Sequence, residues 1–289
     1  MNLLVLWDVD YTLVSADGLG TRLYEIVFRE MFGRELPAVA PKAGRTDRAI
    51  IGDTLALAGV PRAHVDDFLA VLARAAADGA VRAQVRPMAG AAEAIAALAS
   101  FGGLAAPSPG IRQSVLTGNI RPLAALKLRL AGLGHHLDLD VGAYEDAHEV
   151  RAELVPVSRG AASRAYGADF SGASTALVGD TPLDVEAARA TGARAVAVAT
   201  GSYSAAELAA AGADAVLPDL TDTALVLAAV TGGQSTRAER ATRAEQATRA
   251  ERATRAEQGN RASTGGGGRS SRAGGAPWPP QGRSRRPPT

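Results

Sequence analysis

The sequence contains no cysteine among its 289 residues. This absence excludes disulfides, thiolate nucleophiles and zinc or iron–sulfur sites with cysteine ligands. The four histidines, His64, His135, His136 and His148, show no spacing typical of metal ligands, and the adjacent pair is more typical of a solvated loop. Neither residue type therefore predicts a metal site.

Long apolar runs are also missing. No stretch approaches the roughly 20 apolar residues of a membrane-spanning helix. The opening run, residues 1–7, leads directly into acids and has neither a basic start nor a small-residue cleavage site, so it is not typical of a secretory signal. We expect a soluble protein of the cytoplasm that does not enter membranes.

Lysine is scarce, and the charge is unevenly distributed. Only Lys42 and Lys127 are lysines, against 29 arginines, which we interpret as a bias of the encoding genome. The formal net charge is +1, but residues 232–289 hold 12 arginines and 4 glutamates, so the residues before them are net acidic. The two parts of the chain are therefore considered separately.

The C-terminal part is a low-complexity tail. From Thr236 it repeats a six-residue unit rich in Thr, Arg, Ala and Glu, and it then becomes rich in Gly, Ser, Arg and Pro. A period of six forms no continuous apolar stripe on a helix, so we expect residues 232–289 to be disordered or to form a frayed single helix. A basic arm that binds nucleic acid is the alternative function for this segment.

Before the tail, short apolar runs alternate with Ala- and Leu-rich amphipathic stretches. This pattern predicts an α/β fold with a doubly wound, Rossmann-like parallel sheet. The candidate strands are residues 3–7, 113–116, 139–141, 175–178, 195–199 and 215–217. Between Val14 and Arg86 the sequence has helical periodicity and no convincing strand. We therefore predict a core of residues 1–14 and 87–231 and a helical insertion of residues 15–86.

Three of the predicted strands end in polar residues. The first leads into Asp8, Asp10 and Thr12; a second leads into Thr117, Gly118 and Asn119; a third leads into Asp180 and Asp184. Each group alone also fits an ordinary turn or helix cap. Together they place acids and hydroxyl or amide donors at one edge of a parallel sheet, where ligands bind. Clustered carboxylates repel one another, so we expect a divalent cation with oxygen ligands, Mg²⁺, to bind there.

The order DxDxT, Thr at a strand end, a basic residue and GDxxxD resembles the haloacid dehalogenase superfamily over roughly residues 3–220. It is most similar to the phosphoglycolate phosphatase-like branch, whose helical cap follows the first motif. The resemblance implies a Mg²⁺-dependent phosphatase that acts on a small phosphorylated metabolite. A phosphotransferase or mutase, or a non-catalytic binding protein with a nucleic-acid-binding tail, remain the alternatives.

The resemblance also implies a role for each motif residue. Asp8 matches the nucleophile that forms an aspartyl-phosphate, and Asp10 matches the general acid and base, an acid that the dehalogenases lack. Thr117 matches the phosphate-binding hydroxyl, with the amides of Gly118 and Asn119 beside it. The metal ligands correspond to the Asp8 carboxylate, the Asp10 carbonyl oxygen and Asp180, with Asp184 as a supporting acid.

The chain departs from the family pattern at two positions, and a third residue has two interpretations. Tyr11 stands where the family usually has glycine, and no lysine occupies the third motif. Arg151 is the predicted substitute, with a surface ion pair to Glu149 or Glu153 as the alternative, and Lys127 is expected on the solvated face of a helix. Arg45 resembles part of the cap's specificity loop and is expected to contact the substrate, unless it only precedes a helix capped by Thr46 or Asp47.

Overall fold

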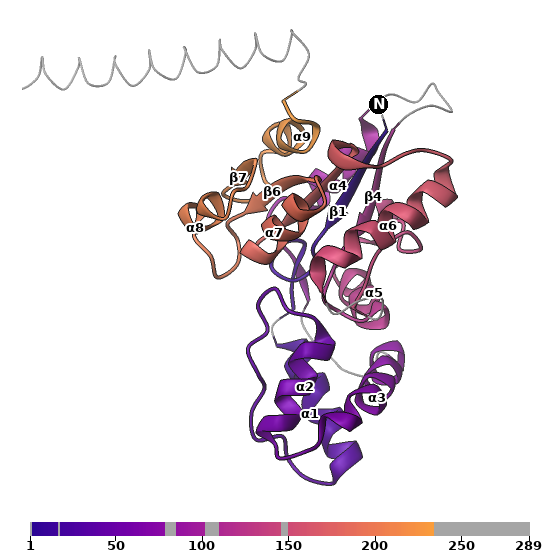
Figure 1. Ribbon diagram of the computed structural model, residues 1–289, viewed down its shortest axis with the longest axis vertical. Helices are drawn as coiled ribbons and strands as arrows, with labels where there is room; N and C mark the ends of the chain where they lie inside the picture. The colour runs from indigo at the N-terminus through magenta and orange to yellow at the C-terminus, as the bar shows by residue number, and fades with distance from the viewer. Residues whose placement is uncertain (1, 17, 79–84, 102–109, 146–149, 234–289) are drawn as a thin grey trace, which may run out of the picture. The chain divides into compact units, whose positions relative to one another are not determined.

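The computed structural model describes residues 2–16, 18–78, 85–101, 110–145 and 150–233. Five parallel strands form one sheet in the order β4-β1-β5-β6-β7 (Figure 1). The strands are β1 (Leu3–Trp7), β4 (Ile111–Val115), β5 (Thr175–Gly179), β6 (Arg194–Val198) and β7 (Ala215–Leu217). The predicted doubly wound parallel sheet is confirmed, whereas the predicted disorder of the tail concerns residues outside those described.

Helices cover both faces of the sheet because alternate residues of each strand point to opposite sides. Leu3, Val5 and Trp7 of β1 belong to one hydrophobic cluster, and Leu4 and Leu6 belong to another. The first cluster also contains residues of α4 (Ala91–Ser100), α5 (Arg121–Leu130) and α9 (Thr223–Thr231). The second contains residues of α6 (Arg151–Tyr166), α7 (Pro182–Ala190) and α8 (Ala205–Ala210).

The predicted strand at residues 139–141 is wrong. These residues form a turn and a bend, and the chain near them makes only an isolated β-bridge between Leu116 and Ala143. The Asp138 amide donates to the Gln113 carbonyl oxygen at 2.9 Å, but the Asp138 carbonyl oxygen accepts from the Ser114 hydroxyl. The same carbonyl oxygen also accepts from the Val141 amide at 3.4 Å, so residues 138–141 close a turn where the prediction had an extended strand.

The helical insertion, residues 15–86, holds α1 (Leu19–Phe32), α2 (Asp47–Leu57) and α3 (Val65–Asp78). A short antiparallel pair, β2 (Val14–Ser15) and β3 (Arg86–Pro87), joins its two ends. Tyr24 of α1 and Phe68 of α3 meet edge to face with ring centroids 5.9 Å apart, and α3 also packs against α5. The insertion and the sheet belong to one compact unit, residues 1–234, so the boundaries at 14/15 and 86/87 stay a prediction.

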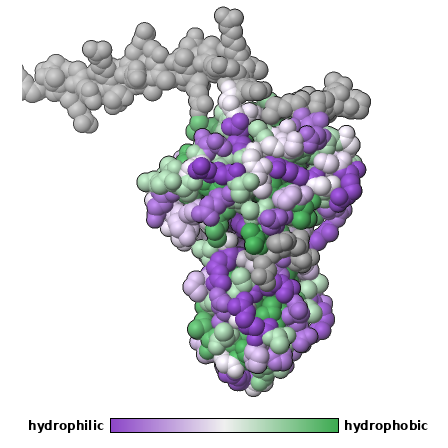
Figure 2. Space-filling model, viewed as in Figure 1, coloured by the Kyte–Doolittle hydropathy of each residue, from purple (hydrophilic) through white to green (hydrophobic). Residues whose placement is uncertain are grey.

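Three short 3₁₀ helices complete the described elements, at Arg62–His64, Gly134–His136 and Gly172–Ser174. On the face drawn in Figure 2, hydrophilic and hydrophobic residues are interspersed over both the sheet region and the insertion. Within the described residues, no helix combines the length and the hydropathy that a membrane span requires.

Candidate active site

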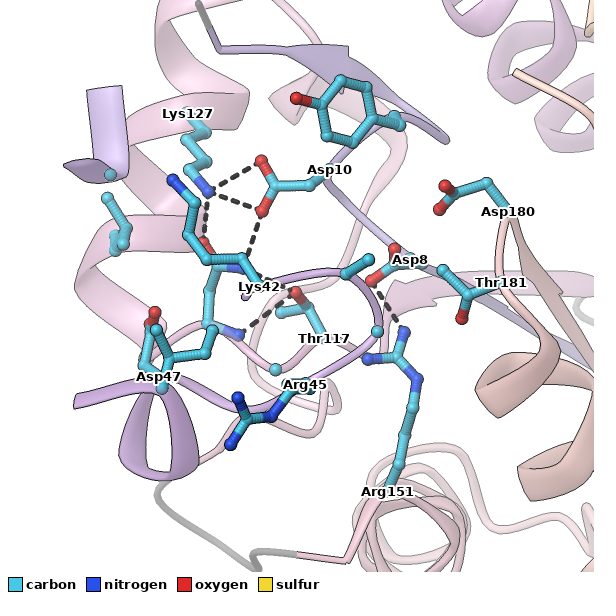
Figure 3. A pocket seen from close by; sticks show the side chains of 18 of the residues that line it. Asp8, Asp10, Lys42, Arg45, Asp47, Thr117, Lys127, Arg151, Asp180 and Thr181 are labelled. Atoms are coloured by element: carbon cyan, nitrogen blue, oxygen red, sulfur yellow. Dashed lines mark hydrogen bonds and ion pairs between the residues drawn. The ribbon is translucent and has the colours of Figure 1, made fainter. Parts of the chain in front are cut away.

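The sheet order brings the three predicted polar strand ends together. Strand β1 lies between β4 and β5, and the chain leaves β1 for β4 on one side and later returns to β5 on the other. Ligands bind at such a switch point, beyond the carboxyl ends of the strands. A pocket of about 240 Å³ opens there (Figure 3). Its lining residues from the sheet side include Asp8, Asp10, Tyr11, Thr117, Gly118, Asn119, Lys127, Arg151, Asp180 and Thr181, and those from the insertion include Lys42, Gly44, Arg45 and Asp47.

Three buried aspartates form an acidic cluster in this region. Carboxylate oxygens of Asp8, Asp180 and Asp184 all lie within 4.8 Å of one another. The Asp8 amide donates to the Val178 carbonyl oxygen at 2.8 Å, which ties the end of β1 to β5. Among the described residues, the Asp180 carboxylate accepts one side-chain hydrogen bond, from the Thr12 hydroxyl at 3.4 Å, and forms no ion pair.

The clustering shifts the protonation of two of these acids. Burial raises the pKa of Asp8 to about 6, and the neighbouring Arg151 limits the rise. Burial, together with repulsion from Asp8 and Asp184, raises the pKa of Asp180 to about 8. A cation bound between these oxygens would remove the repulsion, and carboxylate oxygens are the ligands that hard divalent cations prefer. The residues present therefore fit a divalent metal ion.

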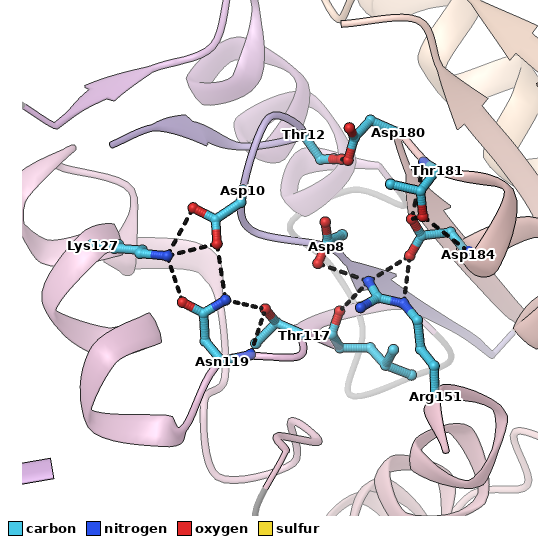
Figure 4. Close-up of polar contacts among 11 residues, drawn as sticks. Asp8, Asp10, Thr12, Thr117, Asn119, Lys127, Arg151, Asp180, Thr181 and Asp184 are labelled. Carbon is cyan, nitrogen blue, oxygen red and sulfur yellow. Dashed lines mark hydrogen bonds and ion pairs between the residues drawn. The ribbon is translucent and has the colours of Figure 1, made fainter. Parts of the chain in front are cut away.

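Arg151 joins two members of the acidic cluster (Figure 4). It is the first residue of α6 and is buried, and its Nη2 lies 2.8 Å from Asp8 Oδ1 and 2.5 Å from Asp184 Oδ1. Although burial opposes its charge, Asp184 and Asp8 keep the pKa of Arg151 above its usual value. The alternative of a surface ion pair does not fit these contacts, because Glu153 is exposed; Glu149 lies outside the described residues.

Asp184 caps a helix and orients Arg151 at the same time. One carboxylate oxygen accepts from the Thr181 amide at 3.1 Å, and the Asp184 amide donates to the Thr181 hydroxyl oxygen at 3.4 Å; these reciprocal bonds form the capping box of α7. The same carboxylate oxygen also accepts from the Thr181 hydroxyl at 2.6 Å. The other oxygen accepts from Nε and Nη2 of Arg151. The Asp184 side chain therefore both caps α7 and holds Arg151 in the site.

The loop after β4 lies beneath a loop of the insertion. Thr117 is buried, and its hydroxyl oxygen accepts from the Asn119 amide at 3.3 Å and from Asn119 Nδ2 at 3.1 Å. A Cβ atom on Gly118 would lie 2.2 Å from the Arg45 carbonyl oxygen, so only glycine fits. The Asp47 amide donates to the Gly118 carbonyl oxygen at 2.6 Å. The insertion thus closes directly over the Thr117–Asn119 loop.

The guanidinium of Arg45 does not contact the acidic cluster of Asp8, Asp180 and Asp184. It contacts Asp53 at 2.6 Å and the carbonyl oxygens of Pro41 and Ala49, although the residue is one of those that line the pocket (Figure 3). The side chain of Thr46 accepts from the Ala49 amide and caps α2, as the alternative interpretation of this segment requires.

Tyr11 occupies a conformation that normally belongs to glycine. Its φ of 59° is the only positive value at a non-glycine position in the described part of the chain. Its amide donates to the Val14 carbonyl oxygen at 2.8 Å, and its carbonyl oxygen accepts from the Thr200 hydroxyl at 2.6 Å. These bonds hold the turn between Asp10 and Thr12, and the residue as a whole is 55% exposed and lines the pocket.

The expectation that Lys127 lies on a solvated helix face is wrong. Its side chain is only 5% exposed, and its Nζ lies 2.6 and 2.8 Å from the two carboxylate oxygens of Asp10 (Figure 4). Helix α5 lies against the sheet and also packs against α3, so it has less solvated surface than its sequence pattern suggests. Although burial alone would raise the pKa of Asp10, Lys127 and Asn119 lower it below the usual value.

Lys42 is the other pocket residue that the sequence interpretation missed. It comes from the insertion, is exposed and lines the pocket; desolvation of its ammonium group there and the nearby Lys127 lower its pKa. The sequence does contain a signal for both residues. They are the only two lysines in a chain that otherwise uses arginine, and both lie at this pocket.

Comparisons with known proteins agree with this geometry. Residues 151–223 match the model of a family described as HAD-hydrolase-like. A hydrolase from Pseudomonas syringae aligns with a TM-score of 0.54 at 20% identity, covering 78% of this chain and 98% of its own. The chain has the haloacid dehalogenase fold. The resemblance seen in the motifs is thereby confirmed.

Two further solved structures show the same haloacid dehalogenase fold. CbbY from Rhodobacter sphaeroides, in complex with phosphate, aligns with a TM-score of 0.54 at 20% identity, covering 77% of this chain and 96% of its own. A haloacid dehalogenase-like family hydrolase from Streptococcus pneumoniae aligns with a TM-score of 0.51 at 16% identity, covering 78% and 97%. No curated protein matches the chain.

Proposed function

We propose that the protein is a Mg²⁺-dependent phosphatase that hydrolyses a small phosphomonoester through an aspartyl-phosphate intermediate. The observation that carries this proposal is the position of the Asp8 carboxylate. It lies in a pocket between Arg151, 2.8 Å away, and the other two acids of the cluster. A nucleophilic carboxylate beside a fixed cation and a metal-binding set of acids suits transfer of a phosphoryl group.

Each neighbouring side chain has a task in this reaction. Asp8 attacks phosphorus, and Arg151 holds the carboxylate and offers its remaining N–H groups to the phosphoryl oxygens. Asp10 protonates the leaving oxygen and then accepts a proton from the attacking water. Thr117 and the amides after it bind the phosphoryl oxygens. Mg²⁺, held by Asp8, Asp180 and the Asp10 carbonyl oxygen and supported by Asp184, would neutralise charge on the phosphoryl group.

The pocket supports a small substrate. The insertion contributes Lys42, Gly44 and Asp47 to its lining, and the contact between Asp47 and Gly118 closes one side. A helical cap in this position restricts access of a folded macromolecule and excludes water. CbbY, which shares the fold, binds phosphate and, as the D10N mutant, xylulose-(1,5)bisphosphate. We therefore assign the substrate to phosphorylated metabolites and the chain to the phosphoglycolate phosphatase-like branch.

The test is release of inorganic phosphate from a panel of phosphomonoesters, with Mg²⁺ and with EDTA. Turnover should require Mg²⁺ and should fall by at least about 10³-fold in Asp8→Asn, because the amide is no nucleophile. Asp67→Asn, a change on the exposed surface of α3, serves as the control and should retain full activity. Turnover by Asp8→Asn at the normal rate would refute the proposed nucleophile.

The same assay separates hydrolysis from phosphoryl transfer. A phosphatase releases one phosphate for each ester consumed, whereas a phosphotransferase or mutase forms a new phosphate ester. Product analysis by ³¹P NMR distinguishes the two outcomes.

A further inference from the structure

Lys127 is a buried cation whose partners all belong to the pocket. Its side chain is 5% exposed, and its ammonium group contacts both carboxylate oxygens of Asp10 and, at 2.5 Å, Asn119 Oδ1. Burying an ammonium group costs several kcal/mol unless it is paired, and an apolar side chain would fill the same space at lower cost. A structural role alone therefore gives little reason for a lysine at this position of α5.

Asn119 completes a network that fixes the Asp10 carboxylate. An ammonium group donates only, so the oxygen of the Asn119 amide must face Lys127. The amide nitrogen then faces the other way, where it donates to Asp10 Oδ2 at 2.9 Å and to the Thr117 hydroxyl oxygen at 3.1 Å. The carboxylate of Asp10 is thus held by two donors on one side and is linked to the phosphate-binding hydroxyl (Figure 4).

Arg151 and Lys127 serve different acids of the site. Arg151 contacts Asp8 and Asp184, whereas Lys127 contacts Asp10 and Asn119. Lys127 is consequently no replacement for the cation beside the nucleophile. We propose that Lys127 is a positioning residue that holds the Asp10 carboxyl group in line with the leaving oxygen of the substrate. This inference rests on the proposed phosphatase activity.

The reaction step concerned is the first one. A bond forms between Asp8 and phosphorus, the bond between phosphorus and the ester oxygen breaks, and the Asp10 carboxyl gives its proton to that oxygen. In the second step water attacks the aspartyl-phosphate, Asp10 takes a proton back, and Asp8 and phosphate are released. If Asp10 is misplaced, the first step slows for esters whose leaving oxygen needs a proton and slows little for esters whose leaving group departs unprotonated.

Leaving-group dependence therefore tests the proposal. In Lys127→Met, kcat/KM should fall about 10²-fold or more for alkyl phosphates, whose alkoxide leaves poorly. It should fall only a few-fold for p-nitrophenyl phosphate, whose phenolate leaves without protonation. Arg129→Met removes an exposed cation from the same helix and should change neither value. An equal loss for both kinds of ester, or no loss, would overturn the proposal.

A double variant keeps the test decisive if Lys127→Met does not fold. Asp10→Asn combined with Lys127→Met removes both charges of the buried pair, and circular dichroism and thermal melting check its fold. Its kcat/KM for alkyl phosphates should equal that of Asp10→Asn alone, because Lys127 acts only through Asp10. A further loss in the double variant would contradict a positioning role. Absence of phosphate release by the wild-type enzyme would instead refute the proposed function itself.

Discussion

At the scale of single residues, the acids of the site differ in the way their charge is balanced. Asp10 has Lys127 and Asn119 as donors, and its pKa is lowered. Asp8 shares Arg151 with Asp184, and Asp180 forms no ion pair within the described residues. Burial therefore raises the pKa of both Asp8 and Asp180, and repulsion between the clustered acids adds to the rise. The protein without metal therefore stores unfavourable electrostatic energy at its candidate metal site.

This imbalance predicts how stability depends on pH. The folded state keeps protons on Asp8 and Asp180 at pH values where the unfolded chain has lost them, so the free energy of unfolding falls as pH rises. The window runs from the unfolded value of 3.8 to about 6 for Asp8 and to about 8 for Asp180. A shift of two pKa units corresponds to about 3 kcal/mol. The pKa of Asp10 is lowered, so this residue stabilises the folded state at higher pH, and that stabilisation is lost only as the pH falls below the unfolded value of 3.8.

Urea denaturation in EDTA should accordingly show lower stability at pH 8 than at pH 5. Mg²⁺ should restore more stability at pH 8, because the metal binds the deprotonated carboxylates. Asp180→Asn should reduce both the pH dependence and the stabilisation by Mg²⁺. Equal stability at the two pH values in EDTA would show that the acids are not held as the structure indicates.

At the scale of elements, the site depends on one close crossing of two loops. The Arg45 carbonyl oxygen lies where a Cβ atom of residue 118 would be, and the adjacent Asp47 accepts from the Ile120 amide at 2.8 Å and from the Tyr24 hydroxyl at 2.5 Å. The insertion is therefore docked at the start of α5 by the Asp47 carboxylate and by a backbone approach at Gly118 that leaves no room for a side chain.

Gly118→Ala should separate these loops. A Cβ atom 2.2 Å from a backbone oxygen forces a backbone shift, and a displacement of about 1 Å in a catalytic site can cost about 10²-fold in rate. We expect kcat/KM to fall about 10²-fold and stability to fall by about 1–3 kcal/mol. Gly134→Ala, where nothing lies within 4 Å of the added atom, is the matched control for kinetics and thermal melting. Normal kinetics in Gly118→Ala would contradict the crossing.

At the scale of the whole molecule, every described residue that lines the pocket lies between Asp8 and Ser202. The basic segment, residues 234–289, lies outside the residues that the structure describes. A chain truncated after Gly233 should therefore keep its kcat/KM within about two-fold, measured on the best ester of the panel. A salt-sensitive shift of DNA by the full chain, absent after truncation, would assign the tail a separate binding role. Loss of activity on truncation would contradict a pocket confined to residues 8–202.

The motif residues were predictable because chemistry and chain direction act locally. Buried apolar runs predict the strands, and parallel strands place the residues that follow them at one edge, so Asp8, Thr117 and Asp180 were expected at a common site. The predicted strand 139–141 was wrong because residues 138–141 close a turn, with the Val141 amide donating to the Asp138 carbonyl oxygen, and a short apolar run does not distinguish a turn from a strand.

The sequence by itself determined the parallel sheet and the acids at one edge of it, because hydrophobic periodicity and the order of residues after each strand specify both. The order of the motifs also determined the resemblance to the haloacid dehalogenase superfamily. Only the tertiary structure decided which cation serves which acid. Lys127 lies beside Asp10 because α5 has the sheet on one side and α3 on another. Arg45 turns to Asp53 because that carboxylate lies within reach on α2, about two helix turns from its start. Helical periodicity defines a face of a helix, but the neighbour that covers this face depends on packing between segments far apart in the chain.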